Sequence, residues 1–383
     1  MPRRNRTTLV FASIGFAMAF RAHPAHAAAL NFQSIGDLPG GTAYSDVRGI
    51  SADGTTVVGE SDSAAGFQAY RWKAATGITG LGDLPGGSFQ SVAEGVSGDG
   101  AVVVGYSSTS NPGYEAFRWS SATGMQLVGS LNKEPFSRAF GVSADGTTIV
   151  GDGSSTSGNE AWRWTQATGI KGIGDIPGGS FSSIARGVSA NGAVVVGIGT
   201  GTSTNEVEAF RWTAAGGMQS LGDLPGGFTT ARGYAVSADG SVVVGEGSSA
   251  SGTEGFRWTA ATGMVGLGDL PGGQFVSVGQ SISADGSIVT GFGYTAAGST
   301  AMVWDAKHGM QDLKTVLTSA YGLDLTGWTL QSAFVSADGT TFAGPGINPA
   351  GQNVGWIATI PEPTGLAIFA AGAVMNARRR RRR

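Results

Sequence analysis

The chain has 383 residues, of which 66 are glycine and none is cysteine, so disulfides, thiolate metal sites and cysteine nucleophiles are excluded. Its hydrophobic content of 41% and nine tryptophans suffice for a core, and the glycines therefore indicate many tight turns rather than a disordered linker. The net charge of −3 conceals an acidic body, because ten arginines lie in residues 1–27 and 378–383 and leave 14 basic residues against 27 acidic ones. Such a body disfavours nucleic acid as a partner.

Residues 1–27 have the features of a secretory signal peptide. Three arginines within the first six residues precede an apolar segment at 8–20, and Ala25-His26-Ala27 fits the small-x-small cleavage rule. We therefore expect an N-terminal signal helix that the export machinery recognises, and a mature chain that begins at Ala28. The alternative is an uncleaved anchor.

One pattern recurs seven times over residues 28–360. A Ser-Ala-Asp-Gly turn or a close variant begins at Ser51, Ser97, Ser143, Ser189, Ser237, Ser283 and Ser336. A tryptophan follows each turn, at Trp72, Trp119, Trp164, Trp212, Trp258, Trp304 and Trp356. A Gly-Asp-Leu/Ile-Pro-Gly-Gly segment begins at Gly36, Gly82, Gly174, Gly222 and Gly268, and a degenerate form begins at Gly129. Because Asp-Gly joins strands in hairpins and four strands per 40–50 residues are typical of a propeller blade, each repeat is predicted to be one blade.

We therefore predict an all-β fold, a seven-bladed β-propeller of four-stranded blades. The last repeat supplies three strands and lacks its fourth, whereas residues 30–38 resemble an isolated fourth strand. The N-terminal strand is expected to pair with 354–360 and close the ring, which removes exposed sheet edges. The tryptophans are predicted to be packing residues. A β-solenoid or a row of β-sandwiches is the alternative.

The repeats resemble the HAF family of extracellular repeats. The resemblance rests on the Gly-Asp-Leu-Pro-Gly-Gly segment, the Ser-Ala-Asp-Gly turn with its valine-rich strand, and an aromatic-Arg-Trp segment. Where the family reads His-Ala-Phe, this chain reads Gln68-Ala69-Tyr70 or Glu115-Ala116-Phe117, so a role for that histidine does not carry over. The family implies an extracellular location without a defined activity.

Residues 361–383 contain Pro361-Glu362-Pro363, an apolar segment at 364–377 and a final arginine cluster that includes Arg378, Arg379 and Arg380. This order of parts resembles the PEP-CTERM sorting signal. The resemblance implies a short C-terminal apolar helix, transient membrane contact, recognition by an exosortase, and a place on the surface or in the biofilm matrix of a Gram-negative-type bacterium. The alternative is an ordinary tail anchor, with the helix as a transmembrane segment.

The candidate chemistry is sparse, and the sequence predicts no enzyme, cofactor or resident metal. Histidine occurs only at His23, His26 and His308, so neither a His-metal cluster nor a Ser-His-Asp triad can be assembled. The aspartates recur at fixed repeat positions and are predicted to be turn residues. Two opposed carboxylates could still make a polysaccharide-active glycosidase or lyase, and acidic loops could bind calcium; both remain open as alternatives.

One repeat position differs from the rest of the pattern. Three residues before each turn serine the residue type varies widely, whereas its neighbours on either side are mostly small. Strand alternation places this position on the opposite face from the small ones, and a packed core position would keep one size. We therefore predict that it points into a central channel and contacts ligand, such as exopolysaccharide or another surface protein. The candidate ligand residues are Arg48, Glu94, Phe140, Arg186, Tyr234 and Gln280. The alternative is neutral drift of solvated positions.

Overall fold

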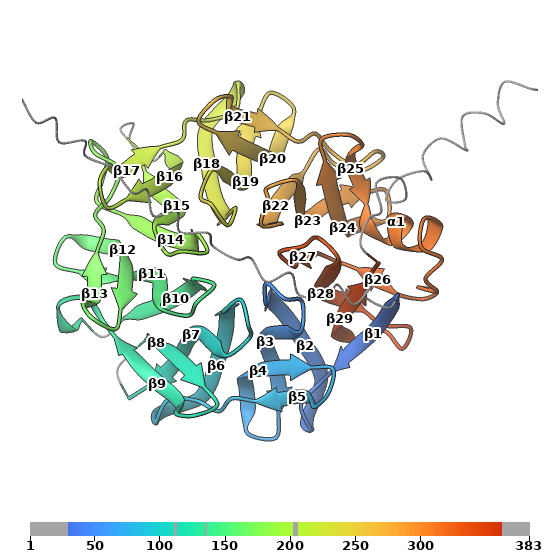
Figure 1. Ribbon diagram of the computed structural model, residues 1–383, viewed down its shortest axis with the longest axis horizontal. Coiled ribbons are helices and arrows are strands. Elements are labelled where there is room, and N and C mark those ends of the chain that lie inside the picture. Colours follow the sequence, from blue (N-terminus) through green and yellow to red (C-terminus); the bar gives the residue numbers. More distant parts are fainter. Residues whose placement is uncertain (1–29, 111–112, 135, 202–205, 362–383) are drawn as a thin grey trace, which may run out of the picture.

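The computed structural model describes residues 30–110, 113–134, 136–201 and 206–361, and its strands form a ring of radiating sheets (Figure 1). The innermost strands are β2 (Gly40–Ile50), β6 (Gly86–Val96), β10 (Ser137–Val142), β14 (Ser183–Val188), β18 (Gly226–Val236), β22 (Ser277–Ile282) and β27 (Phe334–Val335). The second strands are β3 (Thr56–Ser63), β7 (Val102–Thr109), β11 (Thr148–Ser155), β15 (Val194–Thr200), β19 (Val242–Ser249), β23 (Ile288–Thr295) and β28 (Thr341–Ile347).

The outer half of each unit has the same order. The third strands are β4 (Gly66–Lys73), β8 (Tyr114–Ser120), β12 (Gly158–Thr165), β16 (Val207–Thr213), β20 (Gly252–Thr259), β24 (Gly298–Asp305) and β29 (Asn353–Thr359). The outermost strands are β5 (Gly77–Gly80), β9 (Gly124–Gly129), β13 (Gly169–Gly172), β17 (Gly217–Ser220), β21 (Gly263–Gly266), β25 (Gly309–Asp312) and, from the other end of the chain, β1 (Asn31–Gly36).

Hydrogen bonding groups these strands into six sheets: four of four strands, one of five and one of eight. The eight-stranded sheet joins the unit β14–β17 to the unit β18–β21 through a single parallel pair, Val207 with Thr230. Within each unit the main strands pair antiparallel in sequence order, as expected for a propeller repeat. The chain is therefore an all-β propeller, in which two neighbouring units share one continuous sheet.

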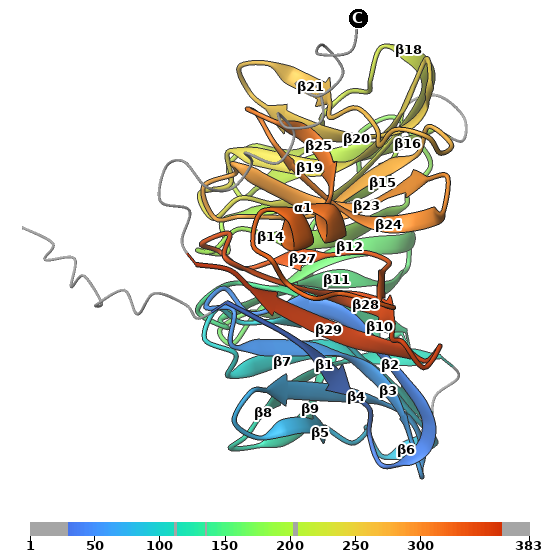
Figure 2. The same cartoon turned by 90° about the vertical axis from the view of Figure 1, so that its right-hand side faces the viewer.

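The predicted closure by the N-terminal strand is confirmed. β1 pairs antiparallel with β29 from Asn31–Thr359 to Gly36–Gly355 and so completes the unit formed by the last repeat. That unit also contains elements that the repeat pattern did not predict. The seven-residue helix α1 (Leu313–Ser319) and the short strand β26 (Thr329–Leu330) come from the longer spacing before the last turn, and α1 lies beside β24 and β25 (Figure 2). The 3₁₀-helix η1 (Leu131–Lys133) occupies the degenerate loop.

The core lies between the sheets, where each unit packs on the next. Strand-two valines such as Val103 and Val104 are fully buried, and so is Phe117 of the third strand. Trp119, two residues later, is half-buried against the same hydrophobic cluster. The prediction that the strand-three tryptophans pack against the core is thus confirmed, although in the first five repeats the aromatic residue two positions before the tryptophan is buried more deeply.

The predicted role of the turn aspartates is confirmed as well. In the second turn the Ser97 hydroxyl donates to Asp99 over 2.7 Å and accepts the Val102 N–H over 2.9 Å. The same two bonds recur in the other turns, with Asn191 in place of aspartate in one of them. The hydrogen bond from Ser97 lowers the pKa of Asp99 below its usual value.

Backbone hydrogen bonds also join the turns to one another. Beginning with Asp53 N–H to Gly98 O, each turn donates one bond of 2.9–3.1 Å to the next, and Ala337 N–H returns to Ala52 O. These bonds form a closed belt, which we call the turn belt, around one end of the central channel. They fix the inner ends of the sheets independently of the side chains.

Toward the other end, buried serines join neighbouring units. Ser91 accepts the Ala69 N–H of the preceding unit over 2.9 Å and donates to Gly82 O over 2.6 Å. Equivalent ties are made by Ser45, Ser137, Ser183 and Ser277. The equivalent residue in β18 is Ala231, so this tie is missing where the two units share one sheet.

Candidate functional site

A cavity of about 410 Å³ lies on the axis of the ring, between the innermost strands of Figure 1. All six side chains that were predicted from their variability line it: Arg48, Glu94, Phe140, Arg186, Tyr234 and Gln280. In the closing unit the equivalent residue, Ala333, is fully buried, and its neighbour Phe334 lines the cavity instead. The structure therefore brings the candidate residues together in one place, and ligand contact by them stays a prediction.

The reason for this placement differs from simple strand alternation. Each of the six residues is the extra residue of a β-bulge: Val47 pairs with Gly59 and Gly49 pairs with Val58, which leaves Arg48 between them unpaired. The other five lie at the same register shift. A bulge redirects a side chain and increases the local twist. The bulge thus turns one residue per innermost strand toward the axis.

A glycine in each second strand and a glycine after the bulge residue in the first four units make this geometry sterically feasible. A Cβ on Gly59 of β3 would overlap the carbonyl oxygen of Asp46, which lies opposite at the bulge. A Cβ on Gly95, next to Glu94, would lie 2.9 Å from the carbonyl oxygen of Phe140 in the neighbouring unit. Small residues at these positions let adjacent innermost strands approach closely around the cavity.

A second layer of variable residues lies beside the first, and the sequence interpretation missed it. It consists of cross-strand pairs between the innermost and second strands: Asp46–Glu60, Val92–Tyr106, Arg138–Asp152, Ile184–Ile198, Arg232–Glu246 and Val278–Phe292. Charged and apolar pairs alternate from unit to unit. The available signal was the residue after each Val-Val-Gly segment, which changes together with the residue five before the turn serine.

The charged pairs compensate three of the arginines near the axis. Arg48 forms ion pairs of 3.1 Å with both Asp46 and Glu60. Burial alone would lower the pKa of Arg48, but Asp46, Glu94 and Glu60 outweigh it and raise that pKa. The guanidinium is therefore a permanent cation held between two carboxylates.

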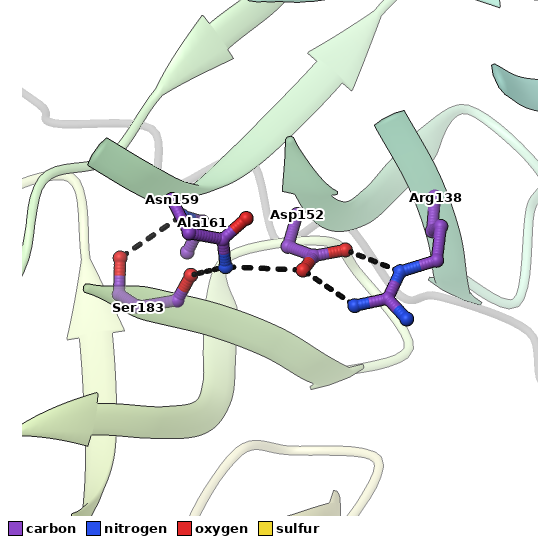
Figure 3. Close-up of polar contacts among 5 residues, drawn as sticks. All are labelled: Arg138, Asp152, Asn159, Ala161 and Ser183. Atoms are coloured by element: carbon purple, nitrogen blue, oxygen red, sulfur yellow. Dashed lines mark hydrogen bonds and ion pairs between the residues drawn. The ribbon is translucent and has the colours of Figure 1, made fainter. Parts of the chain in front are cut away.

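Arg138 is held by a bidentate pair. Its Nε and one terminal nitrogen donate to the two Asp152 oxygens over 3.0 and 2.8 Å, and Asn159 donates to the same carboxylate over 3.1 Å. Figure 3 shows Asp152 between the two donors, with Asn159 also donating to the Ser183 carbonyl of the next unit. Bidentate Arg–carboxylate bonds fix direction as well as charge, so Arg138 is locked in place.

Arg232 and Tyr234 share one carboxylate. Arg232 donates to Glu246 over 2.8 Å, and the Tyr234 hydroxyl donates to the same Glu246 oxygen over 2.9 Å. Burial, together with the nearby Glu246 charge, raises the pKa of the Tyr234 phenol. Tyr234 is therefore a neutral hydrogen-bonding group at neutral pH rather than a base or a nucleophile.

Arg186 and Glu94 have a different environment. Within the described residues, neither side chain has an ion pair or hydrogen bond, and the Arg186 Nε is buried without a partner. The Arg186 guanidinium lies 4.1 Å from the centroid of the Phe140 ring, a cation–π contact. Burial raises the pKa of Glu94 even though Arg48 and Arg186 oppose the shift.

A side pocket of about 380 Å³ adjoins the cavity between β14, β15 and β18. It shares Arg186 and Tyr234 with the cavity, and its walls include Ile184, Ile198 and Val207. This is the junction where the buried serine is replaced by Ala231 and the two sheets merge. The serine tie that is present at five junctions is thus replaced here by a pocket.

Chemically, this arrangement offers charged, aromatic and amide groups that converge from different units. In the described part of the chain, no group of three or more His, Asp or Glu side chains is placed to hold a metal ion.

Of the sorting-signal residues only Pro361 is described, and it is exposed. Glu362, Pro363, Arg378, Arg379 and Arg380 lie outside the described residues, as do both predicted terminal helices. Residues 30–361, as far as they are described, contain no helix long and apolar enough to cross a bilayer.

Comparisons with known proteins identify the fold and no family. No family model matches the chain, and no curated protein matches it. Among solved structures, it is similar to an oligogalacturonate lyase from Vibrio parahaemolyticus at 13% identity and a TM-score of 0.53, covering 88% of this chain and 98% of the lyase. The β-propeller domain of the Trilobed protease from Pyrococcus furiosus matches at 11% identity and a TM-score of 0.50, covering 82% and 92%.

TolB from Acinetobacter baumannii matches at 12% identity and a TM-score of 0.45, covering 81% of this chain, which spans only 65% of that protein. Likeness at such low identity carries no activity with it. Together with the strand pairing, the likeness to the lyase and to the protease domain identifies the chain as an all-β propeller.

Proposed function

We propose that the chain is a non-catalytic binding protein of the cell envelope, a closed seven-bladed propeller that holds its ligand in the central cavity. One observation carries this proposal. The residues that differ most between repeats converge on one cavity, whereas the turns, valine strands and serine ties around them repeat. Ligand sites are usually concave and use a few convergent polar groups.

The electrostatics favour binding over catalysis. Most carboxylates near the axis are held in ion pairs, as Asp152 is by Arg138, and Tyr234 stays protonated. A general acid or base needs a pKa near the working pH and a free approach to substrate. Among the described residues that line the cavity, Glu94 is the one carboxylate, and an acid pair requires two.

Export and sorting complete the proposal. The signal peptide and the PEP-CTERM-like tail support secretion, handling by an exosortase and residence at the outer surface or in the extracellular matrix, where exopolysaccharide or other surface proteins would be the partners. Mass spectrometry of the protein from its native envelope should find termini near Ala28 and near Pro361. Recovery of chains that retain Arg378–Arg383 would contradict removal of the tail.

Binding is tested by screening the purified full chain against glycan and matrix arrays, with release of reducing sugar measured in parallel. A variant with Arg48, Arg186 and Tyr234 all changed to alanine should lose the ligand. A matched control changes Lys171, Thr79 and Gln126 of the outermost strands to alanine and should keep it. Unchanged binding by the cavity variant, or release of sugar by the wild type, would refute the proposal.

A further inference from the structure

Arg186 is exceptional among the four arginines near the axis. Arg48, Arg138 and Arg232 each form an ion pair of 2.8–3.1 Å with a carboxylate of their own unit. Arg186 has no such pair within the described residues. Its Nε, like that of Arg48, is a buried donor without a hydrogen-bond acceptor, but Arg48 Nε lies 3.1 Å from an Asp46 oxygen, whereas no carboxylate of the described residues lies that close to Arg186. A desolvated donor without an acceptor is costly to the empty protein.

The neighbouring units show what is missing. In the units before and after, the second-strand residues of the second layer are acidic, Asp152 and Glu246, whereas Ile198 occupies that place in the unit of Arg186. The apolar Phe140 ring is the partner that Arg186 does have. The guanidinium is therefore held in position while its hydrogen-bonding edge is not used by the protein.

The surroundings of this edge indicate the kind of molecule that fits. The side pocket has an apolar wall of Ile184, Ile198 and Val207, and its volume of about 380 Å³ lies within the range of small-molecule sites. Its lining also includes Ser182, Thr200 and Arg232, and the charge of Arg232 is already compensated by Glu246. Glu94 lines the adjoining cavity, and Glu246 is bonded to Tyr234, which lines both, so a ligand with several negative charges would meet repulsion there. A ligand with a single negative charge and a largely apolar body would avoid this repulsion and would fit the apolar wall of the side pocket.

We propose that Arg186 binds the carboxylate of a monoanionic organic acid whose apolar body occupies the side pocket. This deepens the proposed binding function, on which it rests. The planar guanidinium can donate two parallel hydrogen bonds to a carboxylate. Tyr234 lines both cavities together with Arg186.

Matched small probes test the proposal on the purified full chain by ligand-observed NMR titration. Phenylacetate and the nearly isosteric phenylacetamide share the apolar body, but the amide is neutral and has an NH2 donor in place of one carboxylate oxygen, and phenyl phosphate adds a second charge. We expect phenylacetate to bind at least tenfold more tightly than either of the others. Equal binding of phenylacetamide, tighter binding of phenyl phosphate, or no binding of phenylacetate would overturn the proposal.

Variants locate the site. Arg186→Gln should reduce phenylacetate binding at least tenfold. Arg186→Lys should bind phenylacetate more tightly than Arg186→Gln but more weakly than the wild type, because lysine keeps the positive charge and cannot donate two parallel hydrogen bonds to the carboxylate. Lys171→Gln removes an exposed positive charge from β13 and should leave binding unchanged. Arg186→Gln should keep the Tm of the empty chain close to that of the wild type, because the Arg186 side chain makes no ion pair or hydrogen bond with the described residues, and this measurement separates loss of binding from loss of folding. Wild-type affinity in Arg186→Gln would refute the assignment.

The two proposals can fail separately. If a neutral glycan binds and the triple cavity variant loses it while phenylacetate does not bind, the organic-acid assignment is wrong and the binding function stands. If phenylacetate binds through Arg186 but reducing sugar is released from a glycan, the non-catalytic function is wrong and the anion site stands.

Discussion

Replacing Ser91 with alanine should show how much the buried serine ties contribute to stability. The change removes the acceptor of the fully buried Ala69 N–H and the donor to the half-buried Gly82 carbonyl. An orphaned buried donor costs about 1–3 kcal/mol, and the carbonyl, which water can reach, costs less. We expect the free energy of unfolding to fall by about 2–3 kcal/mol.

The assay is urea unfolding followed by tryptophan fluorescence and circular dichroism, whose transitions must coincide for the comparison to hold. Ser88→Ala, at an exposed serine of the same β6 strand, is the matched control and should change stability by less than about 0.5 kcal/mol. The converse change, Ala231→Ser, supplies the missing tie to Ala209 N–H and should stabilise the chain by about 0.5–1.5 kcal/mol. If Ser91→Ala and Ser88→Ala unfold at the same urea concentration, the ties are not energetically significant.

Three further predictions concern closure, the cavity and the core. Deleting residues 30–36 removes the five backbone pairings of β1 and exposes the edge of β29, so we expect a lower Tm and concentration-dependent aggregation in light scattering; an unchanged Tm would contradict closure. Glu94→Gln should raise the unfolding midpoint at neutral pH. The pKa of Glu94 is raised above its ordinary value of 4.5 in the folded chain, so at neutral pH the ionised carboxylate lowers the free energy of unfolding. Below about pH 4 the carboxyl is protonated in both the folded and the unfolded chain, so the substitution should bring no gain in stability there. An equal gain at neutral pH and at pH 4 would contradict this reasoning. Phe117→Ala should cost about 3–5 kcal/mol in urea unfolding and more than Trp119→Ala, since only Phe117 is fully buried; the reverse order would contradict the packing described.

Local chemistry made much of the fold predictable. The Ser97–Asp99 turn specifies its own hydrogen bonds within five residues, so its meaning does not depend on the rest of the chain. The missing fourth strand of the last repeat and the isolated strand predicted at residues 30–38 indicated closure, because a sheet edge requires a partner. The candidate residues were found from their variability and from strand alternation.

Other features depend on contacts between units, which a repeat pattern does not encode. Arg48 was placed toward the axis by alternation, but it is a bulge opposite Gly59 that directs it there. The cross-strand pairs such as Arg138–Asp152 became evident only once the register was known. Helix α1 has no counterpart in the described residues of the other repeats. The replacement of the tie serine by Ala231 could be connected with the side pocket only once the structure showed that pocket.

The turn belt has a consequence for how this protein can change. Its hydrogen bonds join main-chain groups only, so they do not depend on which side chains face the axis. Substitutions at the bulge positions can therefore accumulate one repeat at a time without disturbing the frame. Duplicated units that begin identical can diverge into a set of different chemical groups around a common centre. The scaffold is in this sense evolvable, and the same freedom makes the bulge positions a natural place to engineer new recognition.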